Sequence, residues 1–277
     1  EDKTMKQKIY TAIVILISLL FFGCKQERTP LQIIFTNDSH SQVEPLKGRG
    51  GFEARAAVID SLRNDNPNTI LLDAGDMFQG SPYFNFYNGR VEVEAYNLMR
   101  YDAATLGNHE FDLGIDTLAA RIKEMNYKIV CCNYDVQGTA LEGLISPYTI
   151  IEKEGWRIGV LGLCVNPSGL IADNNIKGVT YNNPIEAAEK YADILRKKEK
   201  CNLIIALSHL GLFSTDSPDS ICDKTLIETG KADIDIILGG HTHSEHGVYK
   251  FANLKGDSIL VAQEVKSGLN IYSITVK

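Results

Sequence analysis

Short apolar runs alternate with helix-like stretches from residue 31 to the end of this 277-residue chain. This alternation is the pattern of strand–helix units in a sheet that is covered by helices. Because the runs are almost continuously apolar, other layers must cover both faces of the sheet. The runs that we interpret as strands are residues 31–35, 69–72, 103–106, 129–132, 158–163, 203–207, 234–238, 258–262 and 271–276.

Four stretches between these runs have helical patterns. In the last of them, Asn183 is a suitable N-terminal cap and Pro184 suits the first helical turn. The sequence therefore predicts an α/β domain. The predicted helices are residues 52–63, 91–99, 115–125 and 184–198.

Five of the six histidines lie in four polar clusters, each directly after an apolar run, and a fifth cluster is acidic. Because ligands collect at the carboxyl ends of strands in α/β sheets, we expect these side chains to meet. Donors from several strand ends are what a site for two divalent ions requires. The clusters are residues 38–40 (Asp-Ser-His), 73–76 (Asp-Ala-Gly-Asp), 108–110 (Asn-His-Glu), 208–209 (Ser-His) and 240–243 (Gly-His-Thr-His).

The donor types in these clusters indicate which metals would bind. Imidazole mixed with carboxylate and amide oxygen favours Mn, Zn or Fe, whereas an all-oxygen set would favour Mg or Ca. The spacing of two between Asp38 and His40 places both side chains on one side of an extended segment, so that both can reach one ion. His241 and His243 have the same spacing and the same expected geometry.

Taken together, the clusters resemble the calcineurin-like metallophosphoesterases, and more narrowly their bacterial 5′-nucleotidase branch. The resemblance runs from residue 31 to the end of the chain and implies a four-layer α/β/β/α sandwich. The segments that carry it most specifically are residues 36–41 (Thr-Asn-Asp-Ser-His-Ser), 75–82 (Gly-Asp-Met-Phe-Gln-Gly-Ser-Pro) and 107–112 (Gly-Asn-His-Glu-Phe-Asp).

The resemblance implies two divalent metal ions that share Asp76 as a bridging ligand. Every expected ligand is present, whereas a non-catalytic member of the family would usually have lost at least one. The residues implied to hold the first ion are Asp38, His40, Asp76 and His243. Those implied to hold the second ion are Asp76, Asn108, His209 and His241.

The resemblance also implies catalytic roles for Asn108, His109 and Asp112. Asp112 would orient and charge the imidazole of His109, which could then stabilise charge on the phosphoryl group and the leaving oxygen. The alternative is that His109 only hydrogen-bonds to its neighbours. Asp73 and Glu110 are interpreted as residues that brace ligands or backbone amides.

The net charge of −7 argues against nucleic acid as the main partner, because such binding depends on Lys and Arg side chains that neutralise phosphates. An acidic protein that handles phosphate esters must bring cations to them, and bound metals would do so. Arg55 is interpreted as a solvent-facing charge.

The amino end resembles an export signal. Lys6 and Lys8 precede an apolar stretch, residues 9–22, that is shorter than the ~20 residues a membrane span needs. Gly23 and Cys24 then follow, as in a bacterial lipoprotein signal whose Cys is lipidated. We therefore expect an exported protein anchored to a membrane through this lipid, on the periplasmic side or at the cell surface. A short uncleaved anchor is the alternative.

These features predict the domain organisation. The chain begins with Glu1 rather than Met, and Met5 is a candidate for the true start. The expected parts are a signal peptide with a lipoprotein-like Cys (residues 1–24), a short linker (25–30) and a metallophosphoesterase catalytic domain (31–277).

The sequence thus predicts a two-metal phosphoester hydrolase, with nucleoside 5′-monophosphates as favoured substrates. The alternatives are a 2′,3′-cyclic-nucleotide phosphodiesterase, a nucleotide-sugar pyrophosphatase or a non-catalytic metal-binding surface lipoprotein. In the 5′-nucleotidase branch a carboxyl-terminal domain usually supplies the arginines and aromatic pair that grip the nucleotide. Only residues 244–277 follow His243, so we expect a separate polypeptide to carry that domain.

Overall fold

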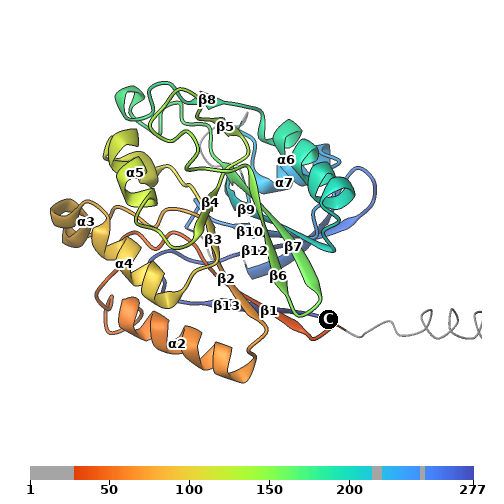
Figure 1. Cartoon of the computed structure of the whole chain (residues 1–277), viewed down its shortest axis with the longest axis horizontal. Helices are drawn as coiled ribbons and strands as arrows, with labels where there is room; N and C mark the ends of the chain where they lie inside the picture. Colours follow the sequence, from red (N-terminus) through yellow and green to blue (C-terminus); the bar gives the residue numbers. More distant parts are fainter. Residues whose placement is uncertain (1–27, 214–219, 244–246) are drawn as a thin grey trace, which may run out of the picture.

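Two β-sheets packed face to face, each covered by helices on its outer side, form the protein. The computed structural model describes residues 28–213, 220–243 and 247–277, so the expected signal segment and Cys24 lie outside the described residues. Helices α2 to α5 cover one sheet and helices α6 and α7 cover the other (Figure 1). This arrangement confirms the predicted four-layer α/β/β/α sandwich.

The first sheet has five strands in the order β13-β1-β2-β3-β4, and only β13 runs antiparallel to its neighbour. Its strands are β1 (Leu31–Thr36), β2 (Thr69–Asp73), β3 (Ala103–Thr105), β4 (Lys128–Val130) and β13 (Tyr272–Val276). The helices on its outer side are α2 (Phe52–Asp65), α3 (Pro82–Tyr87), α4 (Arg90–Met99) and α5 (Gly114–Ile122).

The second sheet has six strands in the order β11-β12-β10-β9-β7-β6. Its strands are β6 (Tyr148–Lys153), β7 (Trp156–Cys164), β9 (Leu203–His209), β10 (Ile236–Gly239), β11 (Gly247–Ala252) and β12 (Ser258–Gln263). Its helices are α6 (Pro184–Asp193), which continues as a π-turn η3 (Ile194–Lys198), and α7 (Asp223–Thr229). The short elements are β5 (Tyr134–Asp135), β8 (Thr180–Tyr181), η1 (His109–Phe111) and η2 (Asp173–Asn175).

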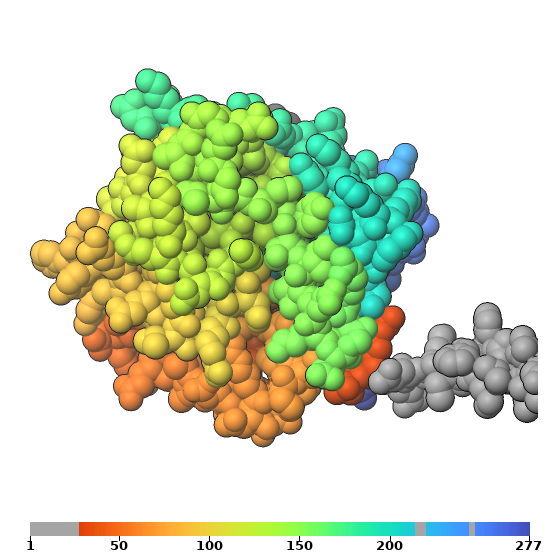
Figure 2. Space-filling view, viewed as in Figure 1, coloured from red at the N-terminus to blue at the C-terminus, as the bar shows by residue number. Residues whose placement is uncertain are grey.

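Alternating side chains on the strands supply separate apolar cores. In β1, Ile33 and Phe35 point into the core between the sheets, whereas Ile34 points into the core under the first helix layer. All three are fully buried, and each such side chain contributes roughly 1.5–3 kcal/mol relative to an exposed one. Over the face seen in Figure 2, segments from both halves of the chain lie in contact. The packed layers therefore hold the strand ends, and the loops that follow them, in fixed positions.

All nine predicted strands and four predicted helices are present, with ends shifted by a few residues. Asn183 caps α6 as predicted, because its Oδ1 accepts a hydrogen bond from the Ile185 amide at 2.9 Å. The sequence did not predict the edge strands β6 and β11, which are only partly buried and so lack a continuous apolar run. Among the described residues, no helix is long and apolar enough to cross a membrane.

Candidate metal centre

The carboxyl ends of strands from both sheets meet at one edge of the sandwich. Asp38 follows β1, and its amide donates a hydrogen bond to Gly75 O, in the loop after β2, at 2.9 Å. His209 ends β9 in the second sheet, and its Nδ1 lies 2.7 Å from Ala74 O. The loops that carry the predicted ligands are therefore tied to one another across the two sheets.

The backbone at the predicted ligands is unusual. Asp38, His40, Asp76, His241 and His243 all have left-handed φ angles, of 47°, 45°, 57°, 78° and 53°. Non-glycine residues rarely adopt this conformation, which costs on the order of 1–3 kcal/mol each and concentrates at functional sites. The prediction that residues 38–40 and 241–243 are extended segments was therefore wrong, since turns aim these side chains inward.

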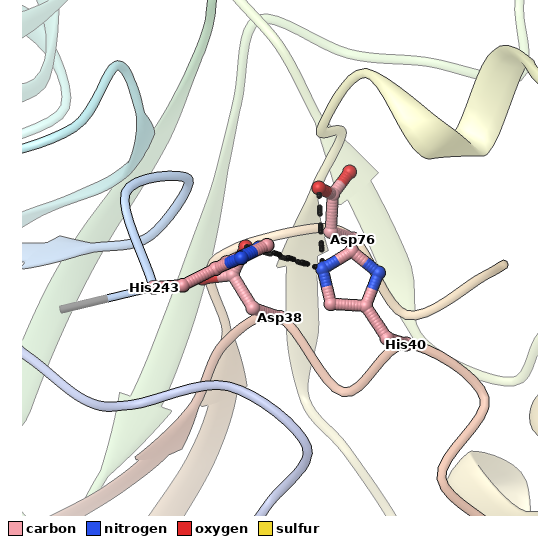
Figure 3. A group of neighbouring side chains, drawn as sticks. All are labelled: Asp38, His40, Asp76 and His243. Carbon is pink, nitrogen blue, oxygen red and sulfur yellow. Dashed lines mark hydrogen bonds and ion pairs between the residues drawn. The ribbon is translucent and has the colours of Figure 1, made fainter. Parts of the chain in front are cut away.

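Four side chains converge on one point, as Figure 3 shows. Each offers a donor atom, and these four atoms all lie within 4.8 Å of one another. His40 Nε2 is 2.7 Å from His243 Nε2 and 3.9 Å from Asp76 Oδ2. Two carboxylates and two imidazoles in this arrangement could hold one metal ion. We call this group the first cluster: Asp38, His40, Asp76 and His243.

The other predicted ligands connect to Asp76 through His209. His209 Nε2 is 3.1 Å from Asp76 Oδ2. The rings of His209 and His241 are 5.2 Å apart, and His241 Nδ1 is 3.1 Å from Asn108 Oδ1. The structure thus brings all seven predicted metal ligands together, with Asp76 between two groups. We call the second group the second cluster: Asp76, Asn108, His209 and His241.

The hydrogen bonding of His209 fits a metal ligand. Because a carbonyl oxygen can only accept, the Nδ1–H of His209 must donate to Ala74 O. Its Nε2 is buried, has no hydrogen-bond partner and faces Asp76 without hydrogen-bond geometry. Metal-binding histidines commonly donate the second ring N–H to a backbone carbonyl in this way. An unpartnered imidazole nitrogen beside a carboxylate is what a bound cation would satisfy.

The charges in the two clusters also favour a cation. Burial raises the pKa of Asp76, but the facing imidazoles of His209 and His40 outweigh burial and hold this pKa below its ordinary value. Burial lowers the pKa of His40, which favours the neutral form that binds metals. Burial also lowers the pKa of His209, but the carboxylates of Asp76 and Asp38 outweigh it and raise this pKa. A divalent cation would supply this positive charge and leave the imidazole nitrogen as a ligand.

Gly107 shows how tightly the donor atoms are packed. A Cβ atom at this position would lie 2.2 Å from Asp76 Oδ1 and 2.7 Å from His209 Nε2. Only glycine therefore lets the backbone after β3 pass this close to the two donors.

His109 lies at the edge of the first cluster and pairs with Asp112. Its Nδ1 is 2.9 Å from Asp112 Oδ2, and its ring centroid is 5.3 Å from that of His40. Burial lowers the pKa of His109, but the hydrogen bond to Asp112 and the charge of Asp76 outweigh burial and raise it. The backbone amide of His109 donates to Asp76 Oδ1 at 2.8 Å. The imidazole is thus held beside the candidate metal centre with its cationic form favoured.

Glu110 braces backbone amides, as the sequence predicted. Its carboxylate accepts hydrogen bonds from the amides of Gly107, Asp76 and Met77, at 2.6, 2.9 and 2.9 Å. These contacts join the loops after β2 and β3. Asp73 has a similar role, because it accepts hydrogen bonds from Thr36 Oγ1 and from the Gly75 amide.

The prediction that Arg55 faces solvent was wrong. Its side chain is only 1% exposed, and its Nη1 donates a hydrogen bond to Ser39 Oγ at 2.8 Å. Ser39 lies in the turn between Asp38 and His40, so the Arg55 guanidinium supports that turn from its buried side. The signal for burial was the helical spacing, because Phe52, Arg55 and Ile59 share the inward face of α2.

A model of the calcineurin-like phosphoesterase family matches residues 31–245, and the chain belongs to this family. It is 33% identical over 228 residues to the snake venom 5′-nucleotidase of Naja atra, a match that covers 77% of this chain and 41% of the relative. The 5′-nucleotidase of Vibrio cholerae is 31% identical over 223 residues, covering 76% of this chain and 40% of the relative.

The solved structures agree with the sequence comparison. The 5′-nucleotidase precursor of Thermus thermophilus matches with a TM-score of 0.78 and 31% identity, over 90% of this chain and 51% of that chain. The family and its 5′-nucleotidase relatives, predicted from the motifs, are thereby confirmed. The chain spans about half or less of the length of these relatives.

Proposed function

We propose that the two clusters bind two divalent metal ions and that residues 31–277 hydrolyse phosphoesters, with nucleoside 5′-monophosphates as the main substrates. The observation that carries this proposal is the convergence of seven donor residues, Asp76 among them, together with the unpartnered Nε2 of His209. Asp38, His40 and His243 would hold one ion together with Asp76. Asn108, His209 and His241 would hold the other.

The metal ions would supply a Lewis acid that binds and polarises the phosphoryl oxygens. The mixed nitrogen and oxygen donors fit Mn, Zn or Fe. The residues of the chain would orient the ester and donate a proton to its leaving oxygen. As a water oxygen bonds to phosphorus and the ester phosphorus–oxygen bond breaks, His109, with Nδ1 held by Asp112, can donate a proton to the leaving oxygen. Asn108, the residue before η1, would hold a metal ion through its side-chain oxygen.

The first prediction tests metal-dependent catalysis. Purified protein supplied with Mn²⁺ should hydrolyse p-nitrophenyl phosphate, EDTA should abolish the activity, and added Mn²⁺ should restore it. Metal content measured beside turnover separates this proposal from a non-catalytic metal-binding protein. A chain loaded with two ions that turns over no ester would contradict the proposal.

The second prediction concerns substrate choice. The 5′-nucleotidase relatives are longer than this chain. We propose that base recognition comes from a further domain outside residues 31–277, on the same or a separate polypeptide. Because a stacked base is worth about 1–3 kcal/mol, residues 31–277 alone should discriminate weakly among nucleotides. A product-resolved screen of nucleoside monophosphates, a 2′,3′-cyclic nucleotide and a nucleotide sugar checks this. Strong base preference at micromolar substrate would place the base site within residues 31–277.

We also propose that the protein is exported and anchored by a lipid on Cys24. The basic and apolar order of residues 6–22, followed by Gly23 and Cys24, supports this. Cys24→Ser should move the protein from the membrane fraction to a soluble exported fraction, or leave the signal uncleaved. Immunoblots of fractionated cells measure the change. A wild-type protein that is soluble, with its amino terminus beyond residue 24, would refute lipidation.

A further inference from the structure

A second polar group lies behind the histidines that come from the second sheet. Ser208, Gly239 and Gln263 occupy matching positions on the parallel strands β9, β10 and β12. Matched residues on neighbouring strands point to the same face of a sheet. Ser208 and Gln263 therefore flank Gly239 on one face, and both side chains are fully buried.

Asp223, at the start of α7, covers the space above Gly239. A Cβ atom on Gly239 would lie 3.0 Å from Asp223 Oδ2 and 3.2 Å from Gln263 Oε1. Ser208 Oγ donates a hydrogen bond to Asp223 Oδ1. Because Gly239 has no side chain, the Asp223 carboxylate can lie between Ser208 and Gln263.

The outer ends of this group adjoin the candidate ligands. Ser208 directly precedes His209. Gln263 Nε2 lies 2.6 Å from Oγ1 of Thr242, the residue between His241 and His243. The two ligand loops also touch, because a Cβ atom on Gly211 would lie 2.6 Å from the Thr242 methyl group. The Asp223 amide donates to Gly211 O at 2.8 Å and holds the first of these loops.

One donor is missing from the middle of the group. Asp223 Oδ2 and Gln263 Oε1 are both buried acceptors without hydrogen-bond partners, although both lie against Gly239. Such orphaned acceptors are costly, so a hydrogen-bond donor is required there. A proton on Asp223 supplies it, and burial raises the pKa of this carboxyl to about 7. Reversing the side-chain amide of Gln263 supplies it equally well, since the Thr242 hydroxyl can then donate to Oε1.

We propose that Asp223 and Gln263 are positioning residues that fix His209, His241 and His243 relative to one another. They would do so through a buried chain of hydrogen bonds from Ser208 to Thr242. This inference rests on the proposed function, because it assigns these histidines to metal ions. It adds two residues that belong to neither cluster, Asp223 on α7 and Gln263 on β12.

The test measures metal affinity rather than turnover alone. Gln263→Leu keeps the side-chain volume but removes both hydrogen-bonding atoms. We expect it to weaken Mn²⁺ binding to EDTA-stripped protein by about 10-fold, the lower end of the range for residues that orient metal ligands. Asp223→Asn should bind Mn²⁺ almost as wild type, because Asn can accept from Ser208 and donate to Gln263. Asp223→Leu should lose affinity as Gln263→Leu does.

Gln32→Leu is the matched control. Gln32 is also a buried glutamine with two side-chain hydrogen bonds, to Ser273 and Thr69, but it lies at the start of β1, away from the ligand loops. Both Leu variants should lower the melting temperature of the metal-free protein, whereas only Gln263→Leu should weaken Mn²⁺ binding and change the visible spectrum of the Co²⁺-loaded protein.

The outcomes separate the two proposals. Equal Mn²⁺ affinity in Gln263→Leu and Gln32→Leu overturns the positioning role alone. A wild-type chain that binds no Mn²⁺ overturns the proposed function and this inference with it. If the buried variants do not fold, Thr242→Val decides, because it removes one hydroxyl at a partly exposed position. The positioning role then requires weaker Mn²⁺ binding in Thr242→Val than in the wild type, and unchanged binding overturns it.

Discussion

Asp76→Asn should remove metal from both clusters and abolish hydrolysis. Asp76 lies between the clusters, with Oδ2 3.1 Å from His209 Nε2 and 3.9 Å from His40 Nε2. The substitution keeps the size of the side chain and an oxygen that can accept from the His109 amide, but it removes the negative charge shared by both ions. Because such a centre supplies several kcal/mol of charge stabilisation, the activity should fall by roughly 10³-fold or more.

Metal content of the purified variant, measured by elemental analysis, checks this result beside turnover of p-nitrophenyl phosphate. Asp102→Asn is the control. Asp102 is a partly buried aspartate that accepts a hydrogen bond from the Leu71 amide, at the opposite ends of the strands. The Asp102→Asn variant should keep both metal ions. Wild-type metal content in Asp76→Asn would rule out a bridging role for this carboxylate.

The sequence predicted which loops meet but not how their backbones turn. Each predicted ligand follows a strand, and parallel strands bring their carboxyl ends to one edge of a sheet. The position of Asp38 after β1 and of His209 at the end of β9 therefore follows from the apolar runs. The left-handed turns at Asp38 and His40 do not, because non-glycine residues adopt this conformation only when the surrounding structure holds them there.

Buried polar residues that lack a motif were the main omission. Asp223 does not follow an apolar run, and nothing in its neighbourhood distinguishes it from a surface aspartate in the first turn of a short helix. Its burial depends on the register of β9, β10 and β12, which places Ser208 and Gln263 on either side of Gly239. Arg55 could have been placed inside from its helical spacing with Phe52 and Ile59. The charge of the side chain suggested otherwise, since buried arginines are rare.

His109→Ala should leave both metal ions bound but reduce turnover of a nucleoside 5′-monophosphate by roughly 10²–10⁴-fold, the range for a positioned acid. His109 is no member of either cluster, and its contact with Asp76 runs through its backbone amide, which alanine retains. Asp112→Asn should cause a smaller loss, because it weakens the orientation and charge of the imidazole without removing it. Loss of an ion from His109→Ala would instead make this residue a ligand.

The leaving group and the pH profile distinguish proton donation by His109 from a merely structural role. A nucleoside alkoxide needs a proton far more than p-nitrophenolate does, so His109→Ala should impair nucleotide hydrolysis much more than hydrolysis of p-nitrophenyl phosphate. Donation requires the protonated imidazole, so turnover should fall as pH rises through the pKa of His109. Asp112 raises that pKa, and Asp112→Asn should therefore move the alkaline limb of the kcat profile to lower pH. Equal losses on both esters, with an unmoved alkaline limb, would assign the proton to another donor.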